Sequence, residues 1–251
     1  MKKLLALFLV LAALLSLSAC KSESNPQSPA GPEETASDRV QTDKVPTLIS
    51  QTEYVLYQNI FFNKQAEDYV NKKAVKEGTF VRLEDRYNDV TRYYVWGYYD
   101  NTKCCDWQWE FVPEDPASLP PNGSLVKMTG TLARDEAALD KLWFVDATVE
   151  TVTRYEGPTA DADLCCMSAT LERVQLANMQ HFPGDFEGRT VRVYGRVLGP
   201  AAIQHPYYDN VWTQDFQTDG AVPAIGTEVI VSGTWTGGSV TGAEVRETRD
   251  Y

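Results

Sequence analysis

Three sequence blocks recur in the same order in the two halves of this chain, and the offset between the copies shrinks slowly. The pairs of blocks are residues 77–83 and 187–193, residues 107–111 and 212–216, and residues 120–131 and 222–234. Ordered blocks with drifting offsets indicate a duplicated domain whose loops have changed length. We therefore expect the chain to fold as two similar units, which strongly limits the architectures open to it.

The repeated blocks have the pattern of short β-strands. Each pairs a turn glycine with alternating apolar residues, and a late glycine inside a strand is typical of a bulge or a barrel corner. An aromatic content of 11% with frequent Val and Thr also favours strands. We expect strands near residues 79–84, 92–99, 107–112, 124–132, 142–151, 189–198, 208–218, 227–235 and 239–248. A further element of the second half is expected before Glu187.

Helical patterns are sparse and occupy matching places in the two halves. Residues 65–76 and 169–179 are the best candidates, one before each copy. The sequence therefore predicts an all-β fold with one short helix preceding each repeat.

The second half resembles the small OB-fold barrels of exported bacterial proteins, including tRNA-anticodon-domain-like lipoproteins. Residues 186–197 and 226–235 carry this resemblance. The first half resembles uncharacterised OB-like modules with a Cys-Cys pair before an aromatic strand that ends in Phe111. The resemblance implies two tandem OB-fold-like barrels, at residues 47–155 and 161–251.

The N-terminus has the pattern of a lipoprotein export signal. Lys2 and Lys3 precede an apolar run that is too short to span a bilayer comfortably. The run ends in Leu17-Ser18-Ala19-Cys20, which resembles the bacterial lipobox, where the cysteine is acylated before cleavage. We expect a signal peptide at residues 1–19, a lipid anchor on Cys20, and an extracytoplasmic location for the rest.

Residues 20–46 are rich in Ser, Pro, Glu and Gln and contain few large apolar side chains. Such a segment buries too little surface to offset its ordering entropy, so we expect a disordered tether. The anchor could lie in the cell membrane, or in an outer membrane if the host has one.

The formal net charge of −12 limits the class of partner. Neutralising nucleic-acid phosphates or anionic lipid head groups requires clustered Lys and Arg, and the chain has no basic cluster. The charge argues against nucleic acid as a partner and leaves the lipid as the expected contact with the membrane.

Four cysteines remain besides Cys20, in two adjacent pairs: Cys104, Cys105, Cys165 and Cys166. An oxidising compartment favours disulfides, and a bond between the pairs is less strained than one between neighbours. The alternatives are free or buried thiols, and a zinc or copper site built from the four thiolates, although adjacent cysteines fit the usual ligand spacing poorly.

Motifs for catalysis are missing from the sequence. No nucleophile elbow, metalloprotease helix or phosphate-binding glycine loop occurs. His181 and His205 are far apart in sequence, and both are expected in exposed turns. We therefore expect a protein that is not an enzyme and has no cofactor.

The aromatic residues offer a candidate binding face. Tyr94 and Trp96 share one side of a strand, and Trp107 and Trp109 share a side of the next. The competing interpretation places most of these rings in the barrel core. The remaining aromatic residues would pack between the repeats or contact a ligand. The expected function is a membrane-anchored binding or assembly module for an envelope protein, peptide or saccharide. A metal-binding lipoprotein is the alternative.

Overall fold

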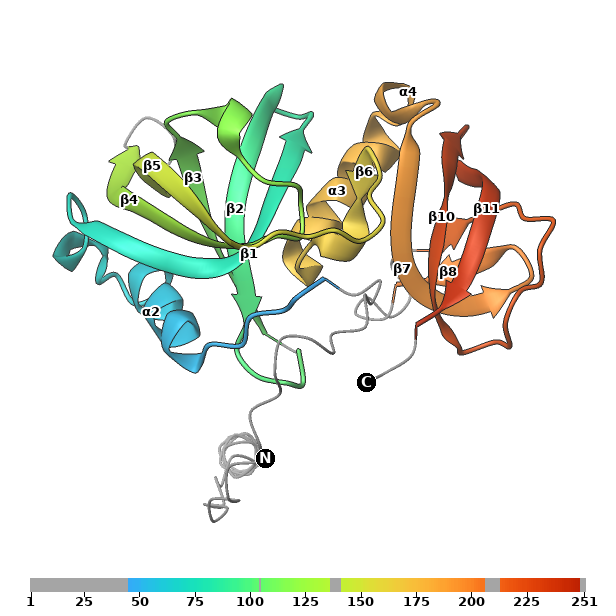
Figure 1. The fold of residues 1–251 in the computed structure, drawn as a ribbon, viewed down its shortest axis with the longest axis horizontal. Helices are drawn as coiled ribbons and strands as arrows, with labels where there is room; N and C mark the ends of the chain where they lie inside the picture. The colour runs from blue at the N-terminus through green and yellow to red at the C-terminus, as the bar shows by residue number, and fades with distance from the viewer. Residues whose placement is uncertain (1–44, 104, 136–140, 206–212, 249–251) are drawn as a thin grey trace, which may run out of the picture. The chain divides into compact units, whose positions relative to one another are not determined.

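A computed structural model describes residues 45–103, 105–135, 141–205 and 213–248. Outside these residues lie the predicted signal peptide, Cys20 with its predicted lipid, most of the predicted tether, and Cys104. Within them the fold is mostly β, as predicted, with two sheets (Figure 1). No helix in the described ranges has the length and apolar character needed to cross a membrane.

The first sheet is a closed ring of five strands in the order β1-β2-β3-β5-β4, with β4 paired back to β1. Its strands are β1 (Lys73–Asp85), β2 (Val90–Tyr98), β3 (Asp106–Pro113), β4 (Leu125–Asp135) and β5 (Lys141–Thr153). Neighbours are antiparallel except β3 and β5, which run parallel. Buried side chains that include Phe80, Trp107 and Phe144 fill its interior.

The second sheet has six strands, in the order β11-β10-β7-β8-β9, with the short β6 paired to β7. Its strands are β6 (Ala162–Asp163), β7 (Thr190–Gly199), β8 (Ala202–Gln204), β9 (Thr213–Asp215), β10 (Glu228–Thr236) and β11 (Ser239–Glu247). A single parallel bridge between Phe216 and Val240 links the region after β9 to β11. The two ends of the sheet are therefore in contact.

The helices are α2 (Gln51–Phe61), α3 (Ala169–His181) and the short α4 (Pro183–Phe186). Three 3-10 turns complete the described elements: η1 (Ala66–Asp68), η2 (Pro116–Ser118) and η4 (Leu164–Cys166). The Ser50 and Ser168 side chains cap α2 and α3, each accepting a hydrogen bond from a backbone N–H in the first turn.

Strand pairing supports the duplication at the second and third blocks. Phe111 pairs in parallel with β5, and Phe216 forms the equivalent parallel bridge to β11. Gly123 and Gly226 share a left-handed conformation, with φ of 86° and 88°, at the turn before β4 and β10. The late glycines Gly130 and Gly233 both fall where the strand register shifts, as a bulge requires.

The first block is aligned wrongly in the sequence comparison. Gly78 lies inside β1, whereas Gly188 lies in the turn before β7 and has a φ of 75°. The counterpart of Gly78 is Gly195, because each pairs with the third residue after the left-handed turn glycine: Gly78 with Val126 after Gly123, and Gly195 with Val229 after Gly226. Strand pairing, rather than local sequence similarity, therefore identifies the residue of the second half that is equivalent to Gly78.

The predicted helix over residues 65–76 is also wrong. Only η1 forms there, and from Lys73 onward the chain is in β1, where it pairs with β4. Long-range strand pairing overrides the local helical pattern. The helix before the first sheet is α2 instead, whereas the helix predicted at 169–179 is confirmed as α3.

The strand predicted over residues 208–218 begins in a stretch outside the described residues and is represented by β9. The further element expected before Glu187 corresponds only to the short β6. The strand that completes the second sheet and was not predicted is β8, which follows β7. β8 has only three residues, too few to show a period in the sequence.

A second buried cluster joins the outer side of the first sheet to α3 and the second sheet. It includes Leu83 and Trp96 from the first sheet, Leu176 from α3, and Val193 and Trp235 from the second. The Trp96 indole Nε1 donates to the carbonyl of Cys166 at 3.0 Å. Packing between the repeats therefore accounts for Trp96, one of the two interpretations left open for the surplus aromatic residues.

Candidate functional site

The structure separates the four aromatic residues of the predicted binding face. Trp107 and Trp109 are buried inside the ring, with 0% and 1% of their surface exposed. Trp96 is buried against η4, and Tyr94 is partly buried. Burial raises the pKa of the Tyr94 phenol, whose oxygen lies 3.4 Å from Glu110 Oε2. These four rings serve packing, and they do not form one accessible face.

The two cysteine segments meet at the contact between the first sheet and α3. Asp106, next to Cys105, accepts hydrogen bonds from the backbone and hydroxyl of Thr170 at 2.9 Å. Cys166 is fully buried, its Sγ donates to the carbonyl of Asp163, and burial raises its thiol pKa well above the usual value. No sulfur–sulfur bond joins the described residues Cys105, Cys165 and Cys166.

A metal site finds no geometric support in the described part of the chain. No group of three or more His, Cys, Asp and Glu side chains is placed to hold an ion there. Because Cys104 lies outside the described residues, pairing through that cysteine and zinc or copper binding both stay predictions.

The histidine predictions have different outcomes. His181 is exposed, as expected, and its ring lies 5.7 Å from that of Tyr87. His205 is buried, with 3% of its surface exposed, so its predicted solvent-facing position is wrong. The reason is a partner on α3: the His205 imidazole contacts the Glu172 carboxylate, whose pKa is raised by its own burial. A buried charge partner makes the burial of this polar ring tolerable.

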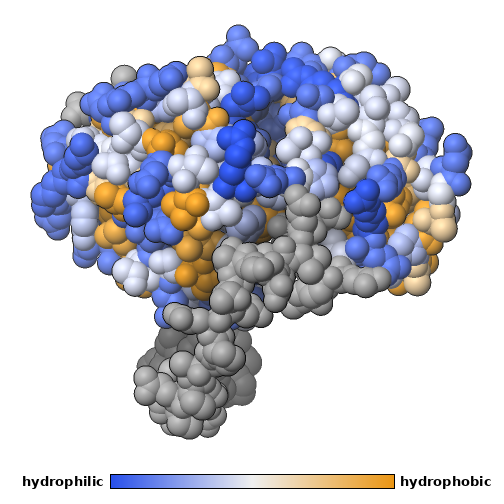
Figure 2. All heavy atoms as spheres, viewed as in Figure 1, coloured by the Kyte–Doolittle hydropathy of each residue, from blue (hydrophilic) through white to orange (hydrophobic). Residues whose placement is uncertain are grey.

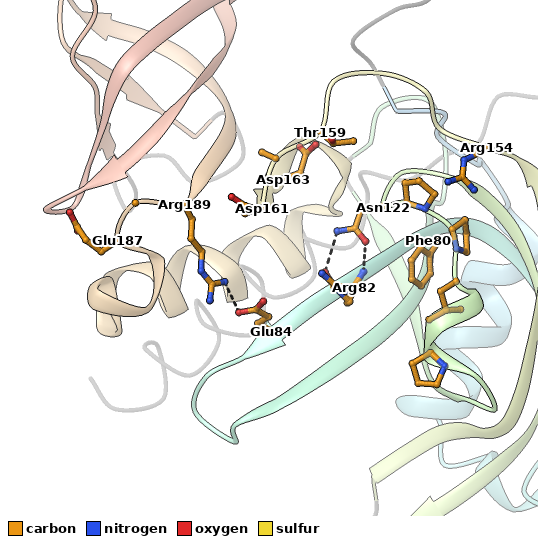
Figure 3. A pocket seen from close by; sticks show the side chains of 16 residues that line it. Phe80, Arg82, Glu84, Asn122, Arg154, Thr159, Asp161, Asp163, Glu187 and Arg189 are labelled. Atoms are coloured by element: carbon orange, nitrogen blue, oxygen red, sulfur yellow. Dashed lines mark hydrogen bonds and ion pairs between the residues drawn. The ribbon is translucent and has the colours of Figure 1, made fainter.

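A cavity of about 800 Å³ lies between β1 and the start of the second sheet (Figure 3). We call it the inter-sheet groove. Its walls come from β1, the segment between β3 and β4, the linker after β5, and the turn before β7. The lining residues are Phe80, Arg82, Glu84, Pro116, Leu119, Pro120, Pro121, Asn122, Arg154, Thr159, Ala160, Asp161, Asp163, Glu187, Gly188 and Arg189.

Alternation along β1 brings the Arg82 and Glu84 side chains to the groove, because residues two apart share one side of a strand. Phe80 is on the same side of β1, but its ring is buried in the interior of the first sheet. The Asn122 side chain binds both backbone groups of Arg82: Oδ1 accepts from its N–H at 2.8 Å, and Nδ2 donates to its carbonyl at 3.3 Å. These two bonds fix the proline-rich wall against β1 (Figure 3).

The linker wall is held by a buried ion pair. Arg192 Nη1 on β7 lies 2.6 Å from Asp163 Oδ2 and also donates to the carbonyl of Pro158 in the linker. Burial raises the pKa of Asp163 to about 6, outweighing the lowering effect of the Arg192 guanidinium. The carboxyl is thus mainly ionised at neutral pH, and the pair ties the linker to the second sheet.

Each carboxylate that lines the groove has an internal partner. Glu84 Oε2 pairs with Arg189 Nη1 at 2.8 Å, and Glu187 Oε2 accepts from the backbone N–H of Gly237 at 3.0 Å. Asp161 accepts from the backbone N–H and hydroxyl of Thr190, which lowers its pKa. Asp163 pairs with Arg192.

Arg82 and Arg154 differ from the other charged residues of the groove. Both side chains are exposed, and neither guanidinium has an ion-pair or hydrogen-bond partner among the described residues. The lining contains no Ser, Cys, His or Lys. The groove therefore offers two guanidinium groups as unoccupied hydrogen-bond donors for a ligand.

Sequence reasoning did not identify this groove. Its residues come from four separate segments, and no linear spacing connects Arg82 with Arg154. The cluster Pro116, Pro120, Pro121 and Gly123 was a usable signal, because it indicates a loop of restricted conformation between two strands. Figure 2 shows hydrophilic residues over the middle of the face in view.

No protein-family model matches the chain, and no significant relative is found among curated proteins.

Proposed function

We propose that this protein is a lipid-anchored, extracytoplasmic binding module without catalytic activity, and that its ligand occupies the inter-sheet groove. The observation that carries the proposal is the groove itself. Its volume of about 800 Å³ is within the range of about 300–1,000 Å³ usual for ligand sites. Ligand sites also tend to occur where two structural units meet, and this groove has walls from both sheets.

Each sheet is, in this proposal, an OB-fold-like barrel. The closed order β1-β2-β3-β5-β4 supports this for the first sheet. The order β11-β10-β7-β8-β9 and the bridge between Phe216 and Val240 support the same connectivity for the second. Barrels of this kind bind ligands with a sheet face and its adjoining loops, which is the composition of the groove walls.

The anchor rests on the sequence. The lipobox-like residues 17–20 and the polar stretch that follows support a lipid on Cys20 and a tether leading to the described fold. Two or more acyl chains bind a membrane stably where one does not. In a host with lipoprotein export, we expect an alkyne-palmitate label on the wild type and none on Cys20→Ser. Equal labelling of both would refute the anchor.

The ligand site is tested by filling the groove. Thr159 is an exposed lining residue, so Thr159→Trp should occupy the space without disturbing the core. Thr148→Trp, exposed on β5 outside the groove, is the matched control. The purified lipoprotein in detergent micelles would be screened on arrays of peptides and cell-wall saccharides.

The proposal predicts ligands that bind the wild type and Thr148→Trp equally but are lost with Thr159→Trp. If every ligand found binds all three proteins equally, the groove is not the binding site.

A further inference from the structure

We propose that the inter-sheet groove is specific for acidic peptide segments, whose carboxylates bind the guanidinium groups of Arg82 and Arg154. This inference rests on the proposed function, because it names the ligand class of the same groove.

The two arginines provide the binding chemistry. Each guanidinium carries several donors in a planar fork that matches a carboxylate, and its charge persists at any physiological pH. Arg189 has Glu84 as a partner at 2.8 Å, whereas Arg82 and Arg154 have none among the described residues. Although the net charge of the chain is −12, these two guanidinium groups leave a defined place for an anion in the groove.

The acidic residues of the groove do not compete for these arginines. The carboxylates of Glu84, Asp161, Asp163 and Glu187 are held by Arg189, Thr190, Arg192 and Gly237 respectively. Their charges still limit the ligand, since four carboxylates face three lining arginines. A dense dianion such as phosphate is repelled more strongly than single carboxylates spaced along a chain.

The shape of the groove favours an extended peptide over a membrane surface. Pro116, Leu119 and Pro121 form an apolar wall beside the arginines, against which aliphatic stems of a peptide can pack. A flat bilayer surface cannot follow this recess, whereas a single extended chain can.

The peptide is bound through its side chains. The edge of β1 that faces the groove is closed, because Asn122 satisfies the N–H and carbonyl of Arg82. The carbonyl of Glu84 and the N–H of Arg86 are both bound by the Asn178 side chain. Addition of a ligand strand to this edge would require breaking these hydrogen bonds. The groove would therefore recognise the side chains of the peptide and not its backbone.

The test measures binding of fluorescein-labelled hexaglutamate to the lipoprotein in detergent micelles by fluorescence anisotropy. Arg82→Gln/Arg154→Gln removes the two proposed contacts. Arg196→Gln/Arg246→Gln changes the net charge equally, at two exposed arginines paired with Glu228 and Glu244 outside the groove.

We expect roughly tenfold weaker binding by the groove variant, as for loss of exposed charge-assisted hydrogen bonds. The control pair should bind as the wild type does, and hexaglutamine should bind none of them. Equal losses in both double variants would overturn the proposal, because they would show a response to net charge alone. Arginine-dependent binding to phosphatidylglycerol vesicles but not to hexaglutamate would also overturn it, in favour of a membrane surface.

Failure of this inference is distinguishable from failure of the proposed function. If hexaglutamate does not bind, but a neutral saccharide or a phosphopeptide binds and is lost with Thr159→Trp, the groove is a ligand site for another class of ligand. If Thr159→Trp changes no binding at all, the site itself is wrong.

Discussion

The Asp163–Arg192 ion pair shows how single residues determine the geometry of the groove. Both side chains are almost fully buried, and Arg192 also donates to the linker carbonyl of Pro158. A buried ion pair is costly to form, but removing one partner leaves an uncompensated charge, which is costlier. The ion pair therefore contributes more to the position of the linker wall than to the net stability of the fold.

Replacing Arg192 by methionine should destabilise the fold by about 3–5 kcal/mol at pH 8, since Asp163 would be left buried and unpaired. The pKa of Asp163 is already raised to about 6 beside the guanidinium, above its ordinary unfolded value, and it should rise further without it. A carboxyl whose pKa is raised in the folded state stabilises the fold at low pH, and this stabilisation is lost as the pH increases. The difference in the free energy of unfolding between the variant and the wild type, measured by urea unfolding, should therefore be smaller at pH 5 than at pH 8.

Arg196→Met is the matched control, because Arg196 pairs with Glu228 at the surface, where such a pair is worth about 0–1 kcal/mol. A deficit for Arg192→Met that is small, or that does not change with pH, would contradict the role given to the pair.

At this scale the sequence predicts turn and bulge residues better than binding residues. Gly123 and Gly130 are recognisable because backbone conformation restricts the residue types allowed there. Arg82 and Arg154 look like ordinary surface arginines in the sequence, because their importance depends on which carboxylates already have partners.

Among the elements, β1 connects the groove to the rest of the fold. It pairs with β2 along one edge and with β4 over residues 73–79 of the other, and the remaining edge is closed by amide side chains. An unpaired strand edge can pair with a strand of another chain, so closure of this edge prevents a foreign strand from adding to β1 beside the groove.

Replacing Asn122 by alanine should expose the backbone of Arg82 at a cost of about 1 kcal/mol. We expect faster amide hydrogen exchange at Arg82, measured by NMR, with little change elsewhere in β1. Asn63→Ala, which removes an exposed contact to Asn59 at 2.8 Å, should leave the exchange at Arg82 unchanged. Unaltered exchange in Asn122→Ala would show that the edge is closed by something else.

The helices illustrate which elements were predictable. α3 begins after Ser168 and follows a clear helical pattern. α2 was missed, although Ser50 and Glu53 have the spacing of a capping box, and the Ser50 hydroxyl accepts from the Glu53 N–H at 3.2 Å. Its aromatic and β-branched residues suggest a strand, but packing against Trp109 and the ion pair between Glu53 and Lys76 stabilise a helix.

For the molecule as a whole, the duplication was visible in the sequence but the joining of the two sheets was not. One shared buried cluster contains residues of both sheets and α3, and within it the Trp96 indole donates a hydrogen bond to the carbonyl of Cys166. Contacts between copies leave no periodic signal, since they depend on how the copies are rotated relative to each other. Only the excess of aromatic residues on both sides of β2 indicated them.

Replacing Trp96 by alanine should therefore uncouple the two sheets. We expect one calorimetric transition in the wild type and two in Trp96→Ala, with a loss of about 3–5 kcal/mol in the variant as for a large buried aromatic residue. Trp143→Ala, which removes a half-buried tryptophan outside both buried clusters, should retain one transition. A single, equally cooperative transition in Trp96→Ala would mean that the sheets are joined mainly by other contacts.

The groove as a ligand site is tested most directly by mapping where a bound peptide lies. Hexaglutamate carrying a photoreactive diazirine would be irradiated with the full-length protein in detergent micelles, and the crosslinked residues would be identified by mass spectrometry. We predict crosslinks confined to residues 116–122, 154–163 and 187–189, and their loss in Arg82→Gln/Arg154→Gln. Crosslinks spread over both sheets, or unaffected by the double substitution, would contradict the assignment of the groove.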